Sequence, residues 1–230
     1  MTDERLVAFP GGGVYFSDRA DGNMSSVGGL GHEQGAVNRQ ALRDRLELRG
    51  LARGYQVHGT VVRTVLRMPE REAQTGELEH ADGQATPLRA LGAMVLAADC
   101  VPVAIAAQGA VAMVHAGWRG LAHGALESGL AAVRGLSDGD GQEAALTAVI
   151  GPCARGCCYE VGPEVHGALA TGAGQRANVD LALVAAQRLS AAGVAEIRTV
   201  GACTICDESF FSHRREGERA GRQAGVAWLS

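Results

Sequence analysis

The chain contains no lysine: its 21 side chains of fixed positive charge are all arginines. Enzymes whose chemistry requires a lysine amine are therefore excluded. A P-loop nucleotide hydrolase needs a lysine at the phosphates, a protein kinase needs one on a strand beside its nucleotide, and a pyridoxal enzyme needs one to form a Schiff base. Any phosphate that this protein binds must be held by arginine side chains, backbone N–H groups and helix N-termini.

Other features are scarce as well. Aromatic residues are 4% of the 230 residues, and the net charge is −4 without runs of basic residues, which argues against a nucleic-acid partner. The longest apolar run, Ala90–Ala98, is far shorter than the roughly 20 residues of a membrane-spanning helix. The acidic start, Met1–Arg5, lacks the apolar segment of a secretory signal. We therefore expect a cytoplasmic protein that binds neither nucleic acid nor membrane; its oligomeric state stays open.

Six cysteines are present, which is too few for the disulfide framework of a small secreted domain in a chain of this length. In a cytoplasmic protein they are expected to be thiols or metal ligands. Cys203 and Cys206 form a C-x-x-C pair, but no second pair has this spacing. A closed zinc site of four cysteines is therefore a lesser alternative. The six are Cys100, Cys153, Cys157, Cys158, Cys203 and Cys206.

Short, continuous apolar runs predict strands that are buried on both faces, and they alternate with amphipathic segments that predict helices. We expect a single domain over residues 1–230 with an α/β fold, a mixed α+β layered sandwich in which helices flank a buried mixed sheet. The glycine-rich segment Gly11–Gly35 is expected to be a long loop. Helices are predicted at Asn38–Arg49, Leu121–Arg134 and Val179–Ala192. Strands are predicted at Val61–Leu66, Ala93–Ala98, Val101–Ala106, Ala110–Val114, Ala145–Ile150, Glu196–Val200 and Val226–Leu229.

Reactive side chains gather where predicted strands begin or end. Cys100 follows the predicted strand Ala93–Ala98, and His115 comes at the end of Ala110–Val114. His58 precedes the predicted strand Val61–Leu66. Because sequential strands usually lie side by side, these residues can meet at one edge of a sheet. Two imidazoles and one thiolate form a zinc ligand set that leaves a position open for water or substrate.

A purely structural role for the same residues is the competing interpretation. A histidine at a strand end often only makes hydrogen bonds, and a buried cysteine often packs as a small apolar residue. The chain also lacks HExxH, HxH and the cytidine-deaminase zinc signature. Residue spacing alone therefore leaves both interpretations open.

Five blocks in order resemble the YfiH family, which was long labelled laccase-like polyphenol oxidase and is now described as zinc-containing purine nucleoside phosphorylases with adenosine deaminase activity. The resemblance extends from about Asn38 to the C-terminus. The blocks are QVHG at Gln56–Gly59, ADC at Ala98–Cys100, HAGWRG at His115–Gly120, IGPC…CCYEVG within Ile150–Gly162 and CT…FFSHRR…GRQ within Cys203–Gln223.

The resemblance implies that His58, Cys100 and His115 are the zinc ligands and that inosine, adenosine, guanosine and methylthioadenosine are candidate substrates. Cys100, Arg119 and Asp99 are the candidate catalytic residues, with Glu160 as another candidate acid. The candidate residues for binding nucleoside and inorganic phosphate are Asn38, Arg39, Arg119, Tyr159, His213 and Arg214, with Arg215 as a further arginine.

Three other functions remain as alternatives. A multicopper oxidase would need a three-copper cluster, for which seven histidines and no HxH motif are a poor supply. A cysteine hydrolase acting in peptidoglycan editing would use Cys100 as nucleophile and His115 as base. Metal storage without catalysis is the third alternative.

Overall fold

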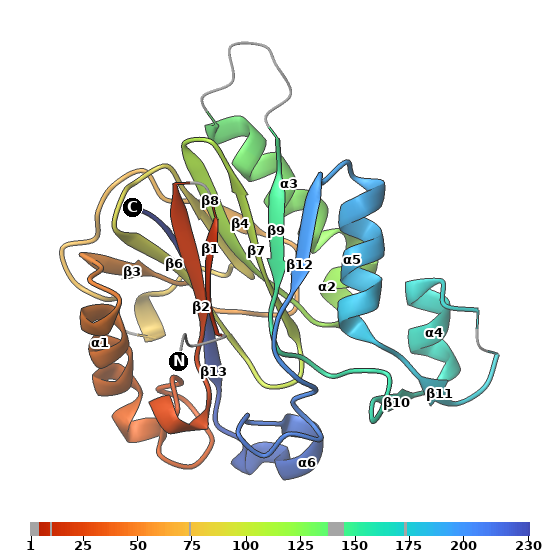
Figure 1. The fold of residues 1–230 in the computed structure, drawn as a ribbon. Helices are drawn as coiled ribbons and strands as arrows, with labels where there is room; N and C mark the ends of the chain where they lie inside the picture. Colours follow the sequence, from red (N-terminus) through yellow and green to blue (C-terminus); the bar gives the residue numbers. More distant parts are fainter. Residues whose placement is uncertain (1–4, 10, 74, 138–144, 173) are drawn as a thin grey trace.

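Two β-sheets stacked face to face form the centre of the molecule in the computed structural model (Figure 1). The structure describes residues 5–9, 11–73, 75–137, 145–172 and 174–230. In spatial order, the first sheet contains β1 (Leu6–Phe9), β2 (Gly12–Phe16), β13 (Gln223–Leu229), β6 (Leu91–Ala97) and β3 (Gly50–Ala52). The second contains β12 (Glu196–Thr199), β9 (Thr147–Ile150), β7 (Val101–Ala107), β8 (Ala110–Ala116), β5 (Gly83–Thr86) and β4 (Val62–Thr64). The short strands β10 (Glu160–Val161) and β11 (Ala177–Asn178) form an antiparallel pair apart from both sheets.

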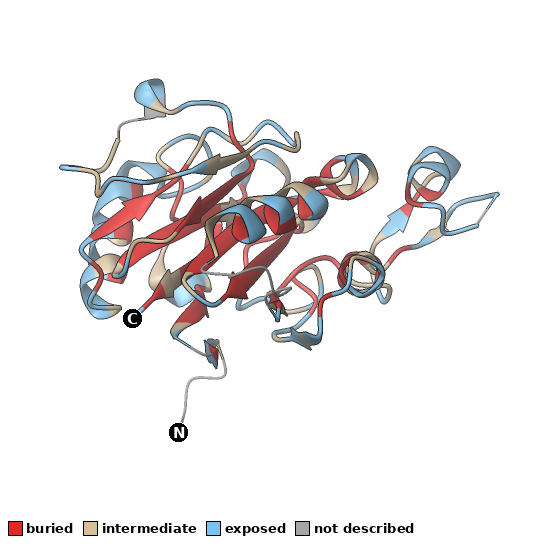
Figure 2. Cartoon of the chain, turned by 90° about the horizontal axis from the view of Figure 1, so that it is seen from above, coloured by how far each residue is buried: buried red, intermediate tan, exposed pale blue. Residues whose placement is uncertain are grey.

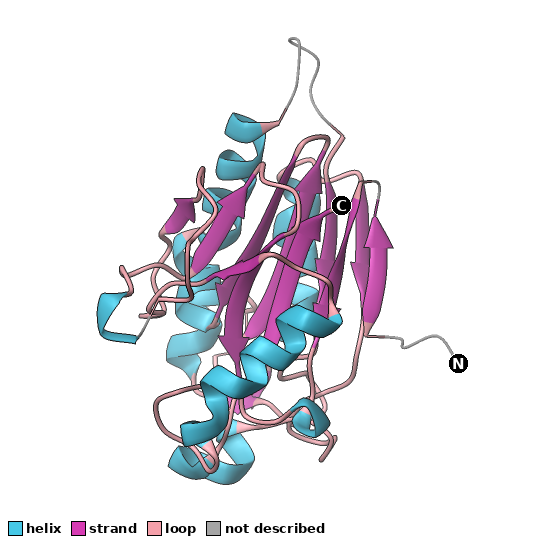
Figure 3. Ribbon diagram, turned by 90° about the vertical axis from the view of Figure 1, so that its left-hand side faces the viewer, coloured by secondary structure: helices cyan, strands magenta, loops and turns pink. Residues whose placement is uncertain are grey.

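Helices lie outside the strands (Figure 3), and buried residues are concentrated in the strands (Figure 2). The α-helices are α1 (Gly35–Arg45), α2 (Trp118–His123), α3 (Ala125–Leu136), α4 (Pro163–Leu169), α5 (Leu181–Ala191) and α6 (His213–Glu216). Short 3-10 helices occur at Arg19–Asp21, His32–Gln34, Thr75–Glu77 and Gly217–Arg219. Within the described ranges, no helix has the length and apolar character needed to cross a bilayer.

Strand residues alternate between two apolar layers, which explains the continuous apolar runs in the sequence. Met113 of β8 packs between the two sheets, whereas its neighbour Val114 packs on the opposite face, against α3. In β6, Val95 faces the layer between the sheets and Met94 packs with Leu42 of α1. Because successive side chains of a strand point to opposite faces, a sheet covered on both sides needs apolar residues at every position. The expectation of a mixed, layered sandwich is confirmed.

The chain passes from one sheet to the other between β6 and β7, and this crossing carries Asp99 and Cys100. Strand β8 then runs antiparallel to β7 and places His115 opposite Pro102. Cys100 and His115 therefore lie at the same end of neighbouring strands, as the order of the strands predicts.

Three sequence expectations need correction. The segment Gly11–Gly35 is not one long loop, because β2 occupies its start and pairs with both β1 and β13. The helix expected over Leu121–Arg134 is divided at Gly124, whose φ of 94° falls in the left-handed region that glycine adopts freely. The first helix ends at Arg45 rather than Arg49, and Glu47 follows with a φ of 55°.

Two glycines of α3 provide a matched test of the helix packing. A Cβ atom at Gly129 would lie 2.6 Å from Val114 Cγ2 and 3.0 Å from Ile105 Cδ1, whereas one at Gly135 meets nothing within 4 Å. We expect Gly129→Ala to lower the free energy of unfolding by about 1–2 kcal/mol through overpacking. Gly135→Ala should raise it by about 0.5–1 kcal/mol through helix propensity. Urea denaturation measures both, and equal effects of the two substitutions would contradict this packing.

Candidate metal and substrate site

A cavity of about 550 Å³ opens where the two sheets meet the loops around Cys100. This volume falls within the range of pockets that bind small molecules. His58, Cys100 and His115 line it, so the structure brings the three predicted metal ligands together. Residues around them in the wall include Ser25, Arg53, Tyr55, Gln56, Asp99, Gly117, Trp118 and Arg222.

The three side chains are arranged as a metal site requires. One ligand atom from each of His58, Cys100 and His115 lies within 4.8 Å of the others. The two imidazole rings meet edge to face, with their centroids 5.1 Å apart. Gly117 leaves room beside them, because a Cβ there would lie 2.9 Å from Cys100 Sγ and 3.1 Å from His58 Cδ2. The donor set and the space fit a transition-metal ion with an open coordination position.

Asp82, which the sequence analysis missed, holds both histidines in place. His115 Nδ1 lies 2.9 Å from Asp82 Oδ1, so this ring nitrogen donates to the carboxylate and the other is left for a metal. The same carboxylate accepts the backbone N–H groups of His58 at 2.9 Å and Gly59 at 2.8 Å. These bonds hold His58 at a φ of 59°, which a non-glycine residue seldom adopts. In the sequence, the only sign of this role is that Asp82 stands directly before the buried strand β5.

Charges in the site favour a thiolate beside an imidazolium when no metal is bound. Burial alone would raise the pKa of the Cys100 thiol, but the charge and hydrogen bond of His115 and the hydrogen bond of His58 lower it to about 6. Burial would lower the pKa of His115, yet the Cys100 thiolate and Asp82 raise it to about 9. The pKa of Asp82 lies below its ordinary value, because hydrogen bonds from His115 and the backbone outweigh its burial. A bound cation would take the place of the imidazolium proton.

Four of the predicted substrate residues line the cavity, namely Arg119, Tyr159, His213 and Arg214. The Arg119 guanidinium lies 4.2 Å from the centroid of the Trp118 ring. Arg214 covers the Tyr159 ring at 4.8 Å and donates a hydrogen bond to the Glu160 carbonyl.

Asn38 and Arg39 lie outside the cavity wall and support the loop behind it. Asn38 donates to the carbonyl of Asn23 at 2.8 Å. The buried Arg39 side chain forms an ion pair with Glu72 and donates to the Met24 carbonyl. Their predicted contacts with substrate remain predictions, and the observed bonds point to a structural role.

Asp99 lies in the cavity wall with a φ of 86°. Its carboxylate accepts hydrogen bonds from Thr204 Oγ1 at 2.7 Å, Ser212 Oγ at 3.1 Å and the Arg214 backbone N–H at 2.7 Å. The catalytic role assigned to Asp99 remains a prediction. These bonds show that it fixes the segment that carries His213 and Arg214.

Arg222 is one of two cavity arginines, with Arg53, to which no role was assigned from the sequence, although the GRQ block contains Arg222. Among the described residues, no ion pair involves it; its Nη1 donates to the carbonyls of Ala220 and Gly221. Burial lowers its pKa, and the negative charges of Cys100 and Asp99 partly offset this effect. Arg53 also lines the cavity but is bound to Glu72.

Cys158 and Cys206 form a disulfide in the structure, which differs from the expectation that all six cysteines are thiols or metal ligands. The loops that carry them run side by side, with a β-bridge between Cys153 and Cys203. Pairing of such distant segments leaves no local sequence signal.

Comparison with known proteins identifies the family. The family described as multi-copper polyphenol oxidoreductase laccase matches residues 11–230, so the chain belongs to it. A relative from Xylella fastidiosa named purine nucleoside phosphorylase is 37% identical over 96% of this chain and 88% of its own. The crystal structure of Neisseria meningitidis protein NMB0706 shares 27% identity, with a TM-score of 0.79 over 98% of both chains. The structure of Bacillus licheniformis protein YfiH, 24% identical, has the same fold, with a TM-score of 0.79 over 100% of this chain and 98% of that one. The resemblance to the YfiH family is confirmed.

The Asp82 carboxylate yields a test of the metal site. We expect Asp82→Asn to weaken Zn²⁺ binding about 10- to 100-fold, because the partner that orients His115 loses its charge. Competition with a chromophoric chelator measures the affinity while the Cys158–Cys206 disulfide is kept intact. Asp180→Asn is the control, since Asp180 pairs with Arg155 and caps α5. Equal affinities in both variants would show that Asp82 does not support the metal ligands.

Proposed function

We propose that this chain is a zinc-dependent purine nucleoside phosphorylase that also deaminates adenosine by hydrolysis, and that residues 1–230 form one catalytic domain. The observation that carries the proposal is that the metal-ligand trio shares its cavity with four arginines, of which Arg53 is paired with Glu72 and the other three are Arg119, Arg214 and Arg222. The names of the relatives support it, because several are called purine nucleoside phosphorylase. Inosine, adenosine, guanosine and methylthioadenosine are the proposed substrates.

His58, Cys100 and His115 would hold the zinc ion. A three-ligand zinc site supplies a Lewis acid and lowers the pKa of bound water towards about 7, which suits hydrolytic deamination. The chain's own contribution is to present one thiolate and two oriented imidazoles beside the cavity. Asp82 fixes the tautomer of His115 through its Nδ1 proton.

Phosphorolysis requires that a phosphate oxygen attack C1′ of the ribose while the bond from C1′ to the purine nitrogen breaks. Without lysine, the fixed positive charge for the anion must come from arginine. Arg222 is the strongest candidate, because it is partly buried in the wall and lacks an acidic partner in the described residues. Burial raises the pKa of Tyr159, and the Cys100 charge adds to this, so its phenol stays protonated and able to donate to the purine.

Replacement of Arg222 tests the phosphate site. We expect Arg222→Gln to raise the KM for phosphate about 10- to 100-fold in inosine phosphorolysis, the effect of losing a charge-assisted hydrogen bond of about 1.5–3 kcal/mol. The KM for inosine should change little. Arg219→Gln is the matched control, since Arg219 is exposed and is not among the residues lining the cavity. Equal values for phosphate in the wild type and Arg222→Gln would remove Arg222 from the site.

Replacement of Cys100 tests the metal requirement. Cys100→Ala should lose zinc from this site and, with it, phosphorolysis and deamination, because the thiolate is the sole charged ligand of the trio. Metal analysis and a nucleoside panel with and without phosphate measure both effects. Full phosphorolysis by Cys100→Ala, or copper content with oxygen uptake on a phenol, would contradict the proposal. A laccase cluster finds little support here, because the trio is the one histidine-containing ligand group within the described residues.

A cysteine hydrolase is a second candidate, and a specific contact favours it. Asp82, His115 and Cys100 form a hydrogen-bonded series in which the carboxylate orients the imidazole and the imidazole contacts the thiol. This is the order of groups in a cysteine nucleophile with its base and orienting acid.

Alkylation distinguishes the two candidates. In metal-free protein, iodoacetamide should modify Cys100 with a rate that rises through about pH 6, because only the thiolate reacts. With one equivalent of zinc the modification should slow strongly, since a metal ligand is protected. Mass spectrometry of the Cys100 peptide gives both rates, with the Cys157 peptide as internal control in protein whose Cys158–Cys206 disulfide is kept intact. Activity towards a hydrolase substrate in the zinc-free protein, lost on zinc addition, would favour the hydrolase.

A further inference from the structure

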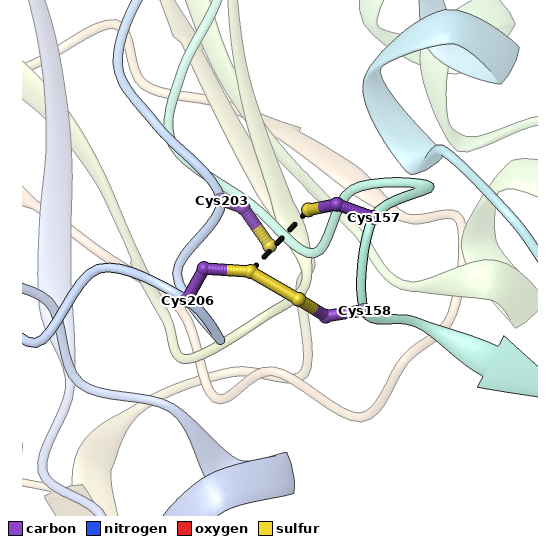
Figure 4. Close-up of side chains that lie close together, drawn as sticks. All are labelled: Cys157, Cys158, Cys203 and Cys206. Carbon is purple, nitrogen blue, oxygen red and sulfur yellow. Dashed lines mark hydrogen bonds between the residues drawn. A yellow bond between two sulfur atoms is a disulfide. The ribbon is translucent and has the colours of Figure 1, made fainter.

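Four cysteine sulfurs converge at a second place, apart from the trio. One loop brings Cys157 and Cys158, another brings Cys203 and Cys206, and their Sγ atoms all lie within 4.8 Å of one another (Figure 4). In the structure the disulfide joins Cys158 to Cys206, and Cys157 Sγ lies 3.4 Å from Cys206 Sγ. A single disulfide accounts for only two of the four sulfurs.

We propose that, in the reduced protein, Cys157, Cys158, Cys203 and Cys206 form a closed structural zinc site. Zinc bonds thiolate sulfur at about 2.3 Å, so sulfurs at the corners of a tetrahedron lie about 3.8 Å apart. Every pair of these sulfurs already lies within 4.8 Å, and reduction of the disulfide would allow Cys158 and Cys206 to separate to the tetrahedral spacing. Cys203 and Cys206 have the two-residue spacing of zinc-binding turns. The adjacent Cys157 and Cys158 supply the second pair, which lacks the C-x-x-C spacing that would mark it in the sequence.

The loop of Cys203 and Cys206 is held as a compact turn. The backbone N–H groups of Cys206 and Asp207 both donate to the Cys203 carbonyl, at 3.2 and 2.9 Å. The Arg215 guanidinium donates to the carbonyls of Thr204 at 2.8 Å and Ile205 at 2.9 Å. Arg215 therefore stabilises the turn and places a positive charge on the loop that carries Cys203 and Cys206. Four thiolates and one Zn²⁺ carry a net charge of −2, which this charge partly offsets.

Formation of the site from the disulfide balances with a dithiol reductant. The reductant transfers two electrons and two protons, the S–S bond of Cys158 and Cys206 breaks, two thiols form, and the reductant becomes a cyclic disulfide. Binding of Zn²⁺ then releases the four thiol protons to solvent. This site shares no ligand with the group of His58, Cys100 and His115. Its existence can therefore be tested independently of the proposed function.

The cluster connects a loop that reaches the cavity wall at Tyr159 to a loop that supports Asp99 of that wall. Tyr159 directly follows Cys158, and Thr204, which follows Cys203, donates to the Asp99 carboxylate at 2.7 Å. A zinc ion here would tie these loops together much as the disulfide does, and would keep the wall in place under reducing conditions.

Metal content of the protein tests the proposal. The full chain is reduced with a dithiol under argon, incubated with ZnCl₂ and freed of excess metal. We expect about two zinc ions per chain in the wild type, one for each site. Cys206→Ser and Cys157→Ser should each keep about one, whereas Cys153→Ala, which removes a neighbouring thiol outside the cluster, should keep both. Cys100→Ser should lose the other zinc and retain the one bound by four cysteines.

Two further measurements complement the metal content, and the second of them needs no variant. Wild-type protein loaded with Co²⁺ should show intense thiolate-to-metal charge-transfer absorption, much of which Cys100→Ser retains. The zinc-loaded protein, denatured with a chelator, should expose all six thiols. A count of four after reduction and loading, the number left free by the disulfide, would overturn the proposal. The same zinc content in wild type and Cys206→Ser would also overturn it.

Discussion

The buried carboxylate of Asp82 is the interaction on which the metal-ligand trio depends. It lies directly before β5, whose first residue pairs with Val114, and its own carbonyl accepts the backbone N–H of His115. One side chain thus joins a strand end to a loop between β3 and β4, and it holds His58 in a backbone conformation that would otherwise be unfavourable. Loss of its charge would affect both histidines at once, although Asp82 itself contacts only one imidazole ring.

A second carboxylate, Asp99, performs a similar task on the other side of Cys100. It lies in the crossing between the two sheets, and its hydrogen bonds secure Thr204, Ser212 and the backbone of Arg214. Cys100 therefore lies between two supports. One is strand β7, which begins at the next residue, and the other is the set of C-terminal loops bound by Asp99. The cavity forms where these loops close over the strand ends, so its shape depends on buried polar bonds as much as on apolar packing.

Local patterns in the sequence predicted the parts of the molecule that depend on local chemistry. The apolar runs identified β6, β7 and β8, and their order brought Cys100 and His115 to one edge. Features that depend on distant partners were missed. Strand β2 is rich in glycine yet lies buried between two strands, and Asp82 acts on a loop 23 to 25 residues away in the chain. Neither the two sheets nor the convergence of the four cysteines could follow from periodicity, because both arise from contacts between segments far apart.

The absence of lysine gains a structural meaning from the way the arginines are used. Arg39, Arg53 and Arg215 are bound to carboxylates and backbone carbonyls and act as internal supports. Arg119, Arg214 and Arg222 line the cavity, where the first two stack on aromatic rings and the third has no acidic partner among the described residues. A guanidinium remains charged throughout the physiological pH range and matches an oxyanion with two parallel donors. The positive charge that these guanidinium groups offer to an anion is therefore constant near neutral pH, so a pH dependence of activity there would come from groups that do titrate, such as the phosphate itself and the Cys100 and His115 pair.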